Sequence, residues 1–237
     1  MIWHYVCSQS DVTVIIPTQS VIDVSQILLD KLTHENWNTI VVSDGGFVEN
    51  CNRGLEEVTT KYVLYLNDDV IPATDSIGRM YDYLETHPLV AVVGGALYSP
   101  EGKPLTSCGR YASLVNAVAE FLHLTRVFKS LHRGHIPFHH ARDVDYVTGA
   151  ALMARRTLDG FDSIFEAYCE DMEYCRRVKS MRVVHLPAAK FIHVESQSYG
   201  PRKKDLILES TEKYLRKYHS VFYTEACMWL YRNRVNL

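Results

Sequence analysis

Four short apolar segments, separated by stretches with the spacing of helices, constrain the fold of this 237-residue chain most strongly. The apolar segments are Val12–Pro17, Thr39–Val42, Lys61–Leu66 and Leu89–Leu97. The stretches between them are residues 21–33, 48–58 and 74–86. Because the strand segments are apolar throughout rather than alternating, we expect helices to cover both faces of their sheet. The pattern predicts an α/β fold built around a parallel sheet.

Acidic residues stand directly after the second and third apolar segments. Asp44 precedes a Gly-Gly turn, and Asn67-Asp68-Asp69 interrupts a buried run that resumes at Val70. A carboxylate is rarely buried without a partner, because its desolvation costs several kcal/mol. In parallel α/β sheets, ligands bind beyond the carboxyl ends of the strands. We therefore expect the functional site at this edge of the sheet.

Composition and charge narrow the class of protein. The formal charge of -3 argues against a general nucleic-acid binder, which is usually basic. No run of 18 apolar residues predicts a membrane-spanning helix, and the N-terminus does not have the pattern of a secretory signal. The six cysteines are scattered and form no CxxC pair, which favours reduced thiols. We expect a soluble, cytoplasmic protein, with peripheral attachment to a membrane left open.

The second half of the chain has a different pattern, which we interpret as part of the same single domain because no repeat or low-complexity linker separates the halves. Its expected elements are a hairpin or loop over 98–110, a helix over 112–131, a strand over 145–156, a helix over Cys169–Lys179, strands at Arg182–Leu186 and Phe191–Val194, and helices from Leu206 onward. The successive parts of the domain would be residues 11–97, residues 98–200 and the C-terminal helices of 205–237.

Three groups of residues are candidates for chemistry. Asn67-Asp68-Asp69 offers oxygen ligands to a hard divalent cation, although a turn with a helix cap would explain the same residues. Glu170-Asp171 opens a predicted helix, where negative charge is favoured in any case by the helix dipole. His193 lies between a strand and a polar loop, and a lone histidine there is more often structural.

Six segments taken in order resemble a known family. They are DVTVIIPT, IVVSDGG, NRGLEEVTTKYVLYLNDDV, VDYVTGAALMARR, GFDSIFEAYCEDMEYCRRVK and FIHVESQS, and they span about residues 11–200. In this order they resemble the family-two inverting glycosyltransferases of the GT-A fold, in particular the rhamnosyltransferase-like branch. The resemblance implies a Rossmann-like, mostly parallel central sheet flanked by helices, with a C-terminal helical extension. It also implies that residues 11–97 form a nucleotide-binding half and residues 98–200 an acceptor and catalytic half.

The resemblance also implies a donor site for a nucleoside-diphosphate-sugar, linked to UDP or dTDP. The residues that match its segments are Pro17, Thr18, Asp44, Asn52, Arg53, Asn67, Asp68, Gly149 and Ala150. Thr18 and Asp44 match residues beside the nucleotide base, and Asn52 and Arg53 match a segment near the base and ribose. Gly149 suits a close approach of the donor sugar to the backbone.

The same resemblance assigns the metal ligands and the catalytic group. Asp69 and His193 match ligands of Mn²⁺ or Mg²⁺, although Asn67 replaces the usual first acidic residue of the DxD element. Asp171, beside Glu170, matches the general base that takes a proton from a hydroxyl of a glycan or glycoconjugate acceptor. The hydroxyl oxygen would then attack the anomeric carbon in one inverting displacement.

Other interpretations stay open at this point. A sugar nucleotidyltransferase would have a glycine-rich loop after the first strand, whereas PTQSVIDVS contains no glycine. A non-catalytic sugar- or nucleotide-binding module of the same fold is a further alternative, and the chain would also suit one module of a larger protein. The histidines at 132, 135, 139 and 140 are loosely compatible with zinc, but a loop on the acceptor side is the favoured interpretation.

Overall fold

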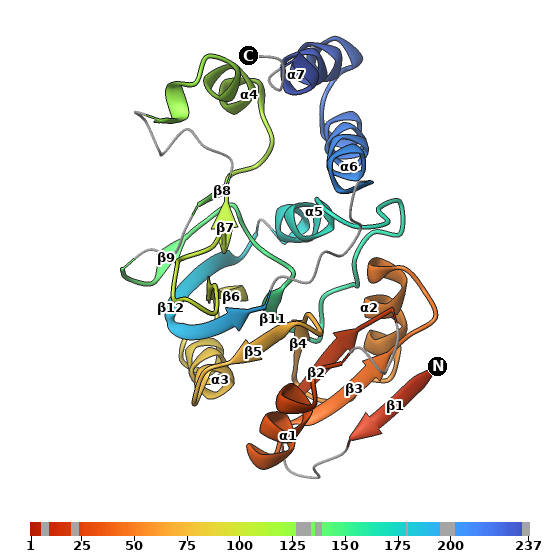
Figure 1. Ribbon diagram of the computed structural model, residues 1–237, viewed down its shortest axis with the longest axis vertical. Helices are drawn as coiled ribbons and strands as arrows, with labels where there is room; N and C mark the ends of the chain where they lie inside the picture. The colour runs from red at the N-terminus through yellow and green to blue at the C-terminus, as the bar shows by residue number, and fades with distance from the viewer. Residues whose placement is uncertain are drawn as a thin grey trace.

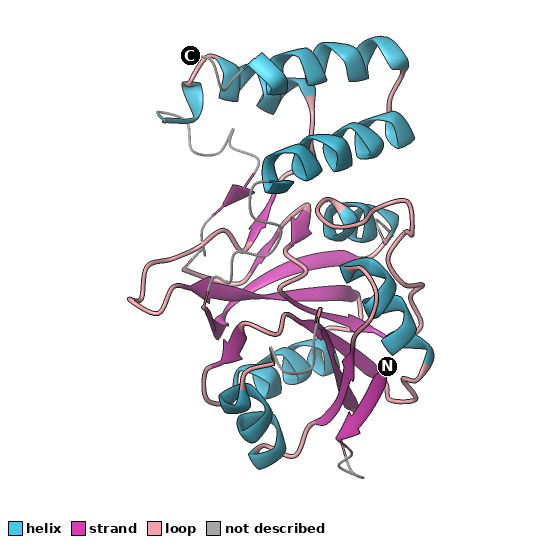
Figure 2. Cartoon of the chain, turned by 45° about the vertical axis from the view of Figure 1, so that its right-hand side comes forward, coloured by secondary structure: helices cyan, strands magenta, loops and turns pink. Residues whose placement is uncertain are grey.

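The computed structural model describes residues 1–5, 10–19, 24–126, 134–135, 139–178, 180–194 and 202–233. It is an α/β protein in which helices flank a large central sheet, and α4, α6 and α7 lie together beyond one end of that sheet (Figures 1 and 2). The helices are α1 (Gln26–His34), α2 (Phe47–Glu56), α3 (Ser76–Thr86), α4 (Leu114–Phe121), α5 (Glu170–Arg177), α6 (Lys203–Tyr218) and α7 (Val221–Asn233). Among the described helices, none is long and apolar enough to cross a membrane.

The central sheet is mixed. Its strands are β1 (Ile2–Tyr5), β2 (Val12–Pro17), β3 (Asn38–Val42), β4 (Tyr62–Leu66), β5 (Val70–Pro72), β6 (Val90–Tyr98), β9 (Arg142–Asp143), β11 (Ala151–Arg155) and β12 (Arg182–His193). The order is β1-β3-β2-β4-β11-β6-β12-β5, with β9 beside β12. As expected, β2 is parallel to both β3 and β4, and β6 is parallel to β12. In contrast, β11 runs antiparallel between β4 and β6.

A smaller sheet lies beside the central one. Its strands are β7 (Cys108–Gly109), β8 (Gly134–His135) and β10 (Tyr146–Val147), in the order β10-β7-β8. The strand β10 leads into the turn at residues 148–150 that precedes β11. This small sheet therefore carries the chain back to the central sheet at the edge where we expect the site.

Successive side chains of the central strands point to opposite faces of the sheet, so the core consists of two clusters. Ile15, Tyr65 and Leu152 pack in one cluster with side chains of α2 and α5. Their neighbours Leu64 and Met153 belong to a second cluster, with side chains of α1 and α3. Both faces are thus buried, which explains why these strands are continuously apolar.

Four expected elements differ in the structure. The strand predicted over residues 145–156 is two strands of different sheets, β10 and β11, separated by the turn at 148–150. The strands predicted at Arg182–Leu186 and Phe191–Val194 are one strand, β12, whose register against β6 shifts between Leu186 and Lys190. Pro187 lies in this shift, and proline is tolerated at such irregularities because no ladder hydrogen bond is needed there. The helix predicted over 112–131 is α4 followed by a 3-10 turn at Leu124–Arg126, and residues 127–133 lie outside the description.

A buried glutamate joins α5 to α6. The side chain of Glu173 is fully buried and accepts hydrogen bonds from Arg177 Nε at 2.8 Å, Lys217 Nζ at 2.6 Å and Tyr218 Oη at 2.9 Å. Arg177 lies on α5 itself, whereas Lys217 and Tyr218 belong to α6. Because α5 begins with Glu170-Asp171, this network fixes the helix that carries the candidate base.

We predict that Glu173→Gln lowers the free energy of unfolding by about 3 kcal/mol, because it leaves two cations beside a buried neutral group. Chemical denaturation would measure this change. Glu212→Gln is a matched control, since Glu212 contacts Arg216 and Arg232, whose side chains are about half exposed. The control should cost less than about 1 kcal/mol. Equal losses in the two variants would contradict a special role for Glu173.

Candidate functional site

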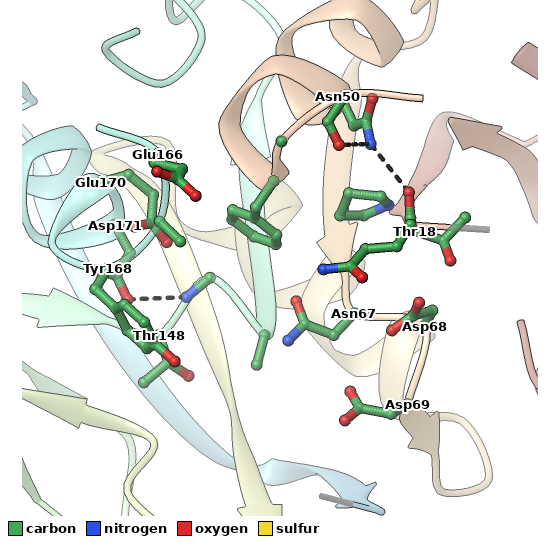
Figure 3. A pocket seen from close by; sticks show the side chains of 18 of the residues that line it. Thr18, Asn50, Asn67, Asp68, Asp69, Thr148, Glu166, Tyr168, Glu170 and Asp171 are labelled. Carbon is green, nitrogen blue, oxygen red and sulfur yellow. Dashed lines mark hydrogen bonds between the residues drawn. The ribbon is translucent and has the colours of Figure 1, made fainter. Parts of the chain in front are cut away.

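A cavity of about 630 Å³ lies beyond the carboxyl ends of β2, β3 and β4 (Figure 3). Its lining comes from the loops after these strands, the start of α2, the turn before β11, the segment before α5, the first turn of α5, the end of β12 and the start of α6. The lining residues are Pro17, Thr18, Gln19, Asp44, Gly45, Gly46, Phe47, Asn50, Asn67, Asp68, Asp69, Thr148, Gly149, Ala150, Glu166, Ala167, Tyr168, Glu170, Asp171, His193 and Lys203. Eleven of the thirteen residues proposed from the sequence are therefore brought to one cavity.

Asn50 on α2 joins the two loops at one side of this cavity. Its Nδ2 donates hydrogen bonds to the carbonyl oxygens of Thr18 and Gly45, both at 3.0 Å. The residue is only 1% exposed. A Cβ atom on Gly45 would lie 2.7 Å from Asn50 Oδ1, so the glycine permits this close contact. One amide thus fixes the loop after β2 against the loop after β3.

Asp44 stands in the second of these loops with a φ of 74°. This left-handed conformation is more accessible to Asp than to most residues. Hydrogen bonds from the Met1 amino group and from Ser43 lower the pKa of the exposed Asp44 carboxyl. Asp44 therefore presents a carboxylate at the rim of the cavity.

The acidic turn and His193 meet through the pairing of two strands. In the antiparallel register of β5 and β12, Val70 lies opposite His193. This places Asp69 Oδ2 3.3 Å from His193 Nε2, with 13% and 23% of the two side chains exposed. The backbone N–H of Asn67 donates to the carbonyl of Ala150 at 3.2 Å, so the acidic turn is also tied to the turn before β11.

The chemistry of Asp69 and His193 fits a divalent cation such as Mn²⁺. Carboxylate oxygen and imidazole nitrogen are both ordinary ligands of Mn²⁺, and Mg²⁺ accepts one or two carboxylates together with phosphate oxygens. Within the described ranges, no group of three or more His, Cys, Asp or Glu side chains is placed to hold a metal. Oxygen atoms of a bound diphosphate or of water would complete the ligand shell of a cation held by these two residues.

The opposite wall is the first turn of α5. Asp171 Oδ2 accepts a hydrogen bond from the backbone N–H of Gly149 at 3.1 Å, and its Oδ1 accepts one from Met172 N at 2.7 Å. The turn into α5 is unusual, because Tyr168 and Cys169 have φ values of 64° and 61°. Two consecutive left-handed residues are sterically costly and are found where the surrounding structure holds them. This backbone places the Asp171 carboxylate at the wall of the cavity.

Gly149 adjoins the carboxyl groups of both Glu170 and Asp171. A Cβ atom on Gly149 would lie 3.4 Å from Glu170 Oε1 and 3.6 Å from the Phe47 ring, which are ordinary contacts. Packing alone therefore does not require glycine at this position, and its absent side chain leaves room in the cavity.

Glu170 differs from Asp171 in its surroundings. It is 5% exposed, and its Oε2 has no hydrogen-bond partner among the described residues. Burial, followed by the nearby Asp171 charge, raises the pKa of the Glu170 carboxyl well above its usual value. Ionisation of Glu170 is therefore disfavoured, whereas two backbone N–H groups stabilise the charged form of Asp171.

Two residues expected at the donor site do not line the cavity. Asn52 donates to the carbonyl of Phe161 and accepts from its N–H, both at 2.8 Å, so it holds the segment before α5. Arg53 Nη1 donates a hydrogen bond to the carbonyl of Ser43 at 3.0 Å, so it holds the loop that carries Asp44. Both side chains thus act on loops of the cavity rather than in it.

Sequence analysis missed several lining residues, and it placed the histidine cluster only loosely. The missed residues include Phe47, Asn50, Glu166 and Tyr168. The last two stand in the same motif as Glu170, which is the one signal that points to them. Of the histidines, His139 and His140 are exposed and do not line the cavity, His135 is described only as part of β8, and His132 lies outside the described residues.

Comparison with known proteins gives a consistent result. The model of a family described as glycosyl transferase family 2 matches residues 6–132. The rhamnosyltransferase WbbL of Escherichia coli strain K12 is 25% identical over 214 residues, which cover 81% of this chain and 78% of that protein.

Two solved structures share the fold. The mannosyltransferase PcManGT from Pyrobaculum calidifontis, in complex with GDP-Man and Mn²⁺, has a TM-score of 0.57 and 15% identity, covering 95% of this chain and 73% of that one. Residues 1–349 of S. aureus TarS, in complex with UDP-GlcNAc, have a TM-score of 0.52 and 12% identity, covering 94% and 72%. These likenesses confirm the GT-A type of α/β fold expected from the sequence.

We predict that Asn50→Asp destabilises the protein by about 2 kcal/mol or more, because a carboxylate oxygen would face two buried carbonyl groups that now accept hydrogen bonds. Chemical denaturation would measure the loss. Asn52→Asp is the matched control, since its carboxylate still accepts the hydrogen bond from Phe161 N–H and loses only one of two bonds. A smaller loss for Asn50→Asp than for Asn52→Asp would contradict the bridging role of Asn50.

Proposed function

Because the chain belongs to glycosyl transferase family 2, we propose that it is an inverting enzyme that moves a sugar from a UDP- or dTDP-linked donor to a hydroxyl of a glycan or glycoconjugate. The observation that carries this proposal is the arrangement of the cavity. The Asp171 carboxylate lies on one wall, and Asn67, Asp68 and Asp69 lie on the other (Figure 3). A donor between these walls would meet a base on one side and a metal site on the other.

The donor site would use the loops after β2 and β3 for the nucleoside. Thr18 and Asp44 line this part of the cavity, and Asn50 holds the two loops together. The turn at Gly149 and Ala150 would face the sugar, since Gly149 leaves room there. The presence of GDP-Man and UDP-GlcNAc in structures of the same fold supports a nucleotide-sugar donor.

Asp69 and His193 would hold Mn²⁺ or Mg²⁺ together with oxygens of the diphosphate. The Mn²⁺ in the mannosyltransferase complex supports a divalent ion in this fold. Such an ion, when bound, stabilises the negative charge that develops on the leaving diphosphate. The two residues supply the protein's share of that site and position the diphosphate against the acidic turn.

Asp171 would act as the general base. Two backbone N–H groups and the start of α5 stabilise its ionised form, which is the form that takes a proton from an acceptor hydroxyl. As the acceptor oxygen bonds to the anomeric carbon, the bond from that carbon to the diphosphate oxygen breaks. The hydroxyl proton passes to Asp171. One displacement from the opposite side inverts the anomeric carbon.

We predict that Asp171→Asn lowers kcat by at least about a hundredfold, because the amide cannot take the proton, and a positioned base typically contributes this much. Transfer to acceptor or hydrolysis of donor would be followed with dTDP-rhamnose, UDP-GlcNAc and GDP-mannose. Donor affinity should be retained, as measured by calorimetry. If neither the parent protein nor the variant turns over a donor that both bind, the non-catalytic binding module is the better interpretation.

We predict that Asp69→Asn abolishes the dependence of donor binding on Mn²⁺, because an amide is a much weaker ligand for a hard cation than a carboxylate. Thermal shifts with each donor, with and without Mn²⁺, would measure this. Bound donor at a hundred times its dissociation constant stabilises the native state by about 2.7 kcal/mol. Asp75→Asn, on an exposed carboxylate outside the cavity, is the control. A Mn²⁺-dependent shift that survives in Asp69→Asn would refute the assignment.

A further inference from the structure

The two acids at the start of α5 differ in their hydrogen-bond partners. Asp171 accepts two backbone hydrogen bonds, from Gly149 and from Met172. Glu170 is more deeply buried, and one of its oxygens has no partner within the described part of the chain. Both carboxyl groups adjoin Gly149, so two negative charges there would repel each other. The state in which only one of the two groups is ionised is therefore favoured.

Among the described residues, the side chains that act on Glu170 include no cation. They are Asp171 on its own helix, the thiol of Cys51 on α2 and the phenol of Tyr168 before α5, and only the backbone N–H of Glu170 itself acts to lower the pKa of this carboxyl. The thiol and the phenol are neutral near pH 7, and Asp171 is the acid of the pair whose charged form is stabilised by two backbone N–H groups. An ionised Glu170 would therefore be a buried charge beside another negative charge, which is strongly unfavourable without compensation.

We propose that Glu170 is a neutral carboxylic acid in the protein and that it donates a hydrogen bond to a hydroxyl of the donor sugar. The hydrogen bond to the donor sugar rests on the proposed function. Glu170 lines the cavity, and its Oε1 lies beside Gly149, where the turn before β11 would face the sugar, whereas Oε2 is enclosed and has no partner among the described residues. A sugar hydroxyl can accept the acid proton and donate its own proton elsewhere.

The inference separates the roles of the two residues. Asp171 carries the charge and takes the proton of the acceptor, whereas Glu170 keeps its proton throughout and recognises the donor. Pairs of acids with environments that push their ionisation apart are a common way to divide such roles. Glu170 is accordingly a specificity residue for the sugar, and the Glu170-Asp171 pair contains one base rather than two.

The protonation can be tested without any substrate, by comparing wild type with Glu170→Gln in urea denaturation at several pH values. An unfolded glutamate ionises near pH 4.5. If folded Glu170 keeps its proton above that pH, the native state binds more protons than the unfolded state, and wild type loses stability relative to the variant as pH rises. The ratio of the two unfolding constants should change by about tenfold per pH unit from pH 5 upward. A constant ratio over this range would overturn the proposal.

The sugar contact is tested by calorimetry with dTDP-rhamnose, UDP-GlcNAc and GDP-mannose in the presence of Mn²⁺, each beside its free nucleoside diphosphate. Glu170→Ala should weaken binding of the matching sugar nucleotide by about tenfold and leave the free diphosphate unaffected. Glu170→Gln, which also donates a hydrogen bond, should recover most of the affinity. Equal weakening of both ligands in Glu170→Ala, or no recovery in Glu170→Gln, would overturn the sugar contact. If wild type binds none of the three donors, the proposed function fails with it, while the unfolding ratio still decides the protonation.

Discussion

The antiparallel position of β11 between β4 and β6 is the constraint on which the candidate site depends. A parallel strand at this place would begin at the far edge of the sheet. Because β11 runs the other way, its start lies beside the end of β4, and Ala151 pairs with Leu66. The turn of residues 148–150 is thereby delivered to the acidic turn after β4, and the hydrogen bond from Asn67 to Ala150 closes this junction. The cavity has its floor at this junction, where chain segments about 80 residues apart meet.

Two further sets of contacts position the walls of the cavity beside this junction. The pairing of β5 with β12 adds His193 on the side of the acidic turn, and the network around Glu173 fixes α5 on the other side. The charges on the two walls have different surroundings. Asp69 faces an imidazole, whereas Asp171 faces backbone N–H groups. A diphosphate and a reacting hydroxyl need such different environments, because one bears negative charge from the start and the other loses a proton during the reaction.

The sequence predicted those parts of the fold whose pattern is local. The apolar strands β2, β3 and β4 and the helices α2 and α3 appear close to where the spacing put them. The sequence did not predict that β11 runs antiparallel to its neighbours. The strand is buried on both faces, so it is as apolar as a strand of a parallel sheet. The single strand β12 was divided in the prediction because Pro187 reads locally as a strand end, and only the pairing with β6 shows that the strand continues.

Within the site, the residues at strand ends were predictable, and those on helices were less so. Asn50 and Asn52 lie two residues apart on α2, so their side chains point about 200° apart around the helix axis. Only one of them can face the cavity, and the local sequence does not decide which. The structure gives that place to Asn50 and turns Asn52 toward Phe161. Likewise, the left-handed pair Tyr168 and Cys169 is held by tertiary contacts and has no local signal, since neither residue is glycine.

The shortness of β5 limits how this region of the protein can change in length. With only three residues, Val70–Pro72, it has one register against β12, and a slip of one residue would turn every side chain to the opposite face of the sheet. His193 would then point away from Asp69. The N–H of Ala73 also donates to the carbonyl of Lys190 on β12. Insertions after Ala73, at residues 74–75, leave these contacts of β5 intact, whereas deletion of one residue within β5 would separate the carboxylate from the imidazole. Variation in this part of the family should therefore collect after Ala73 and spare the strand itself.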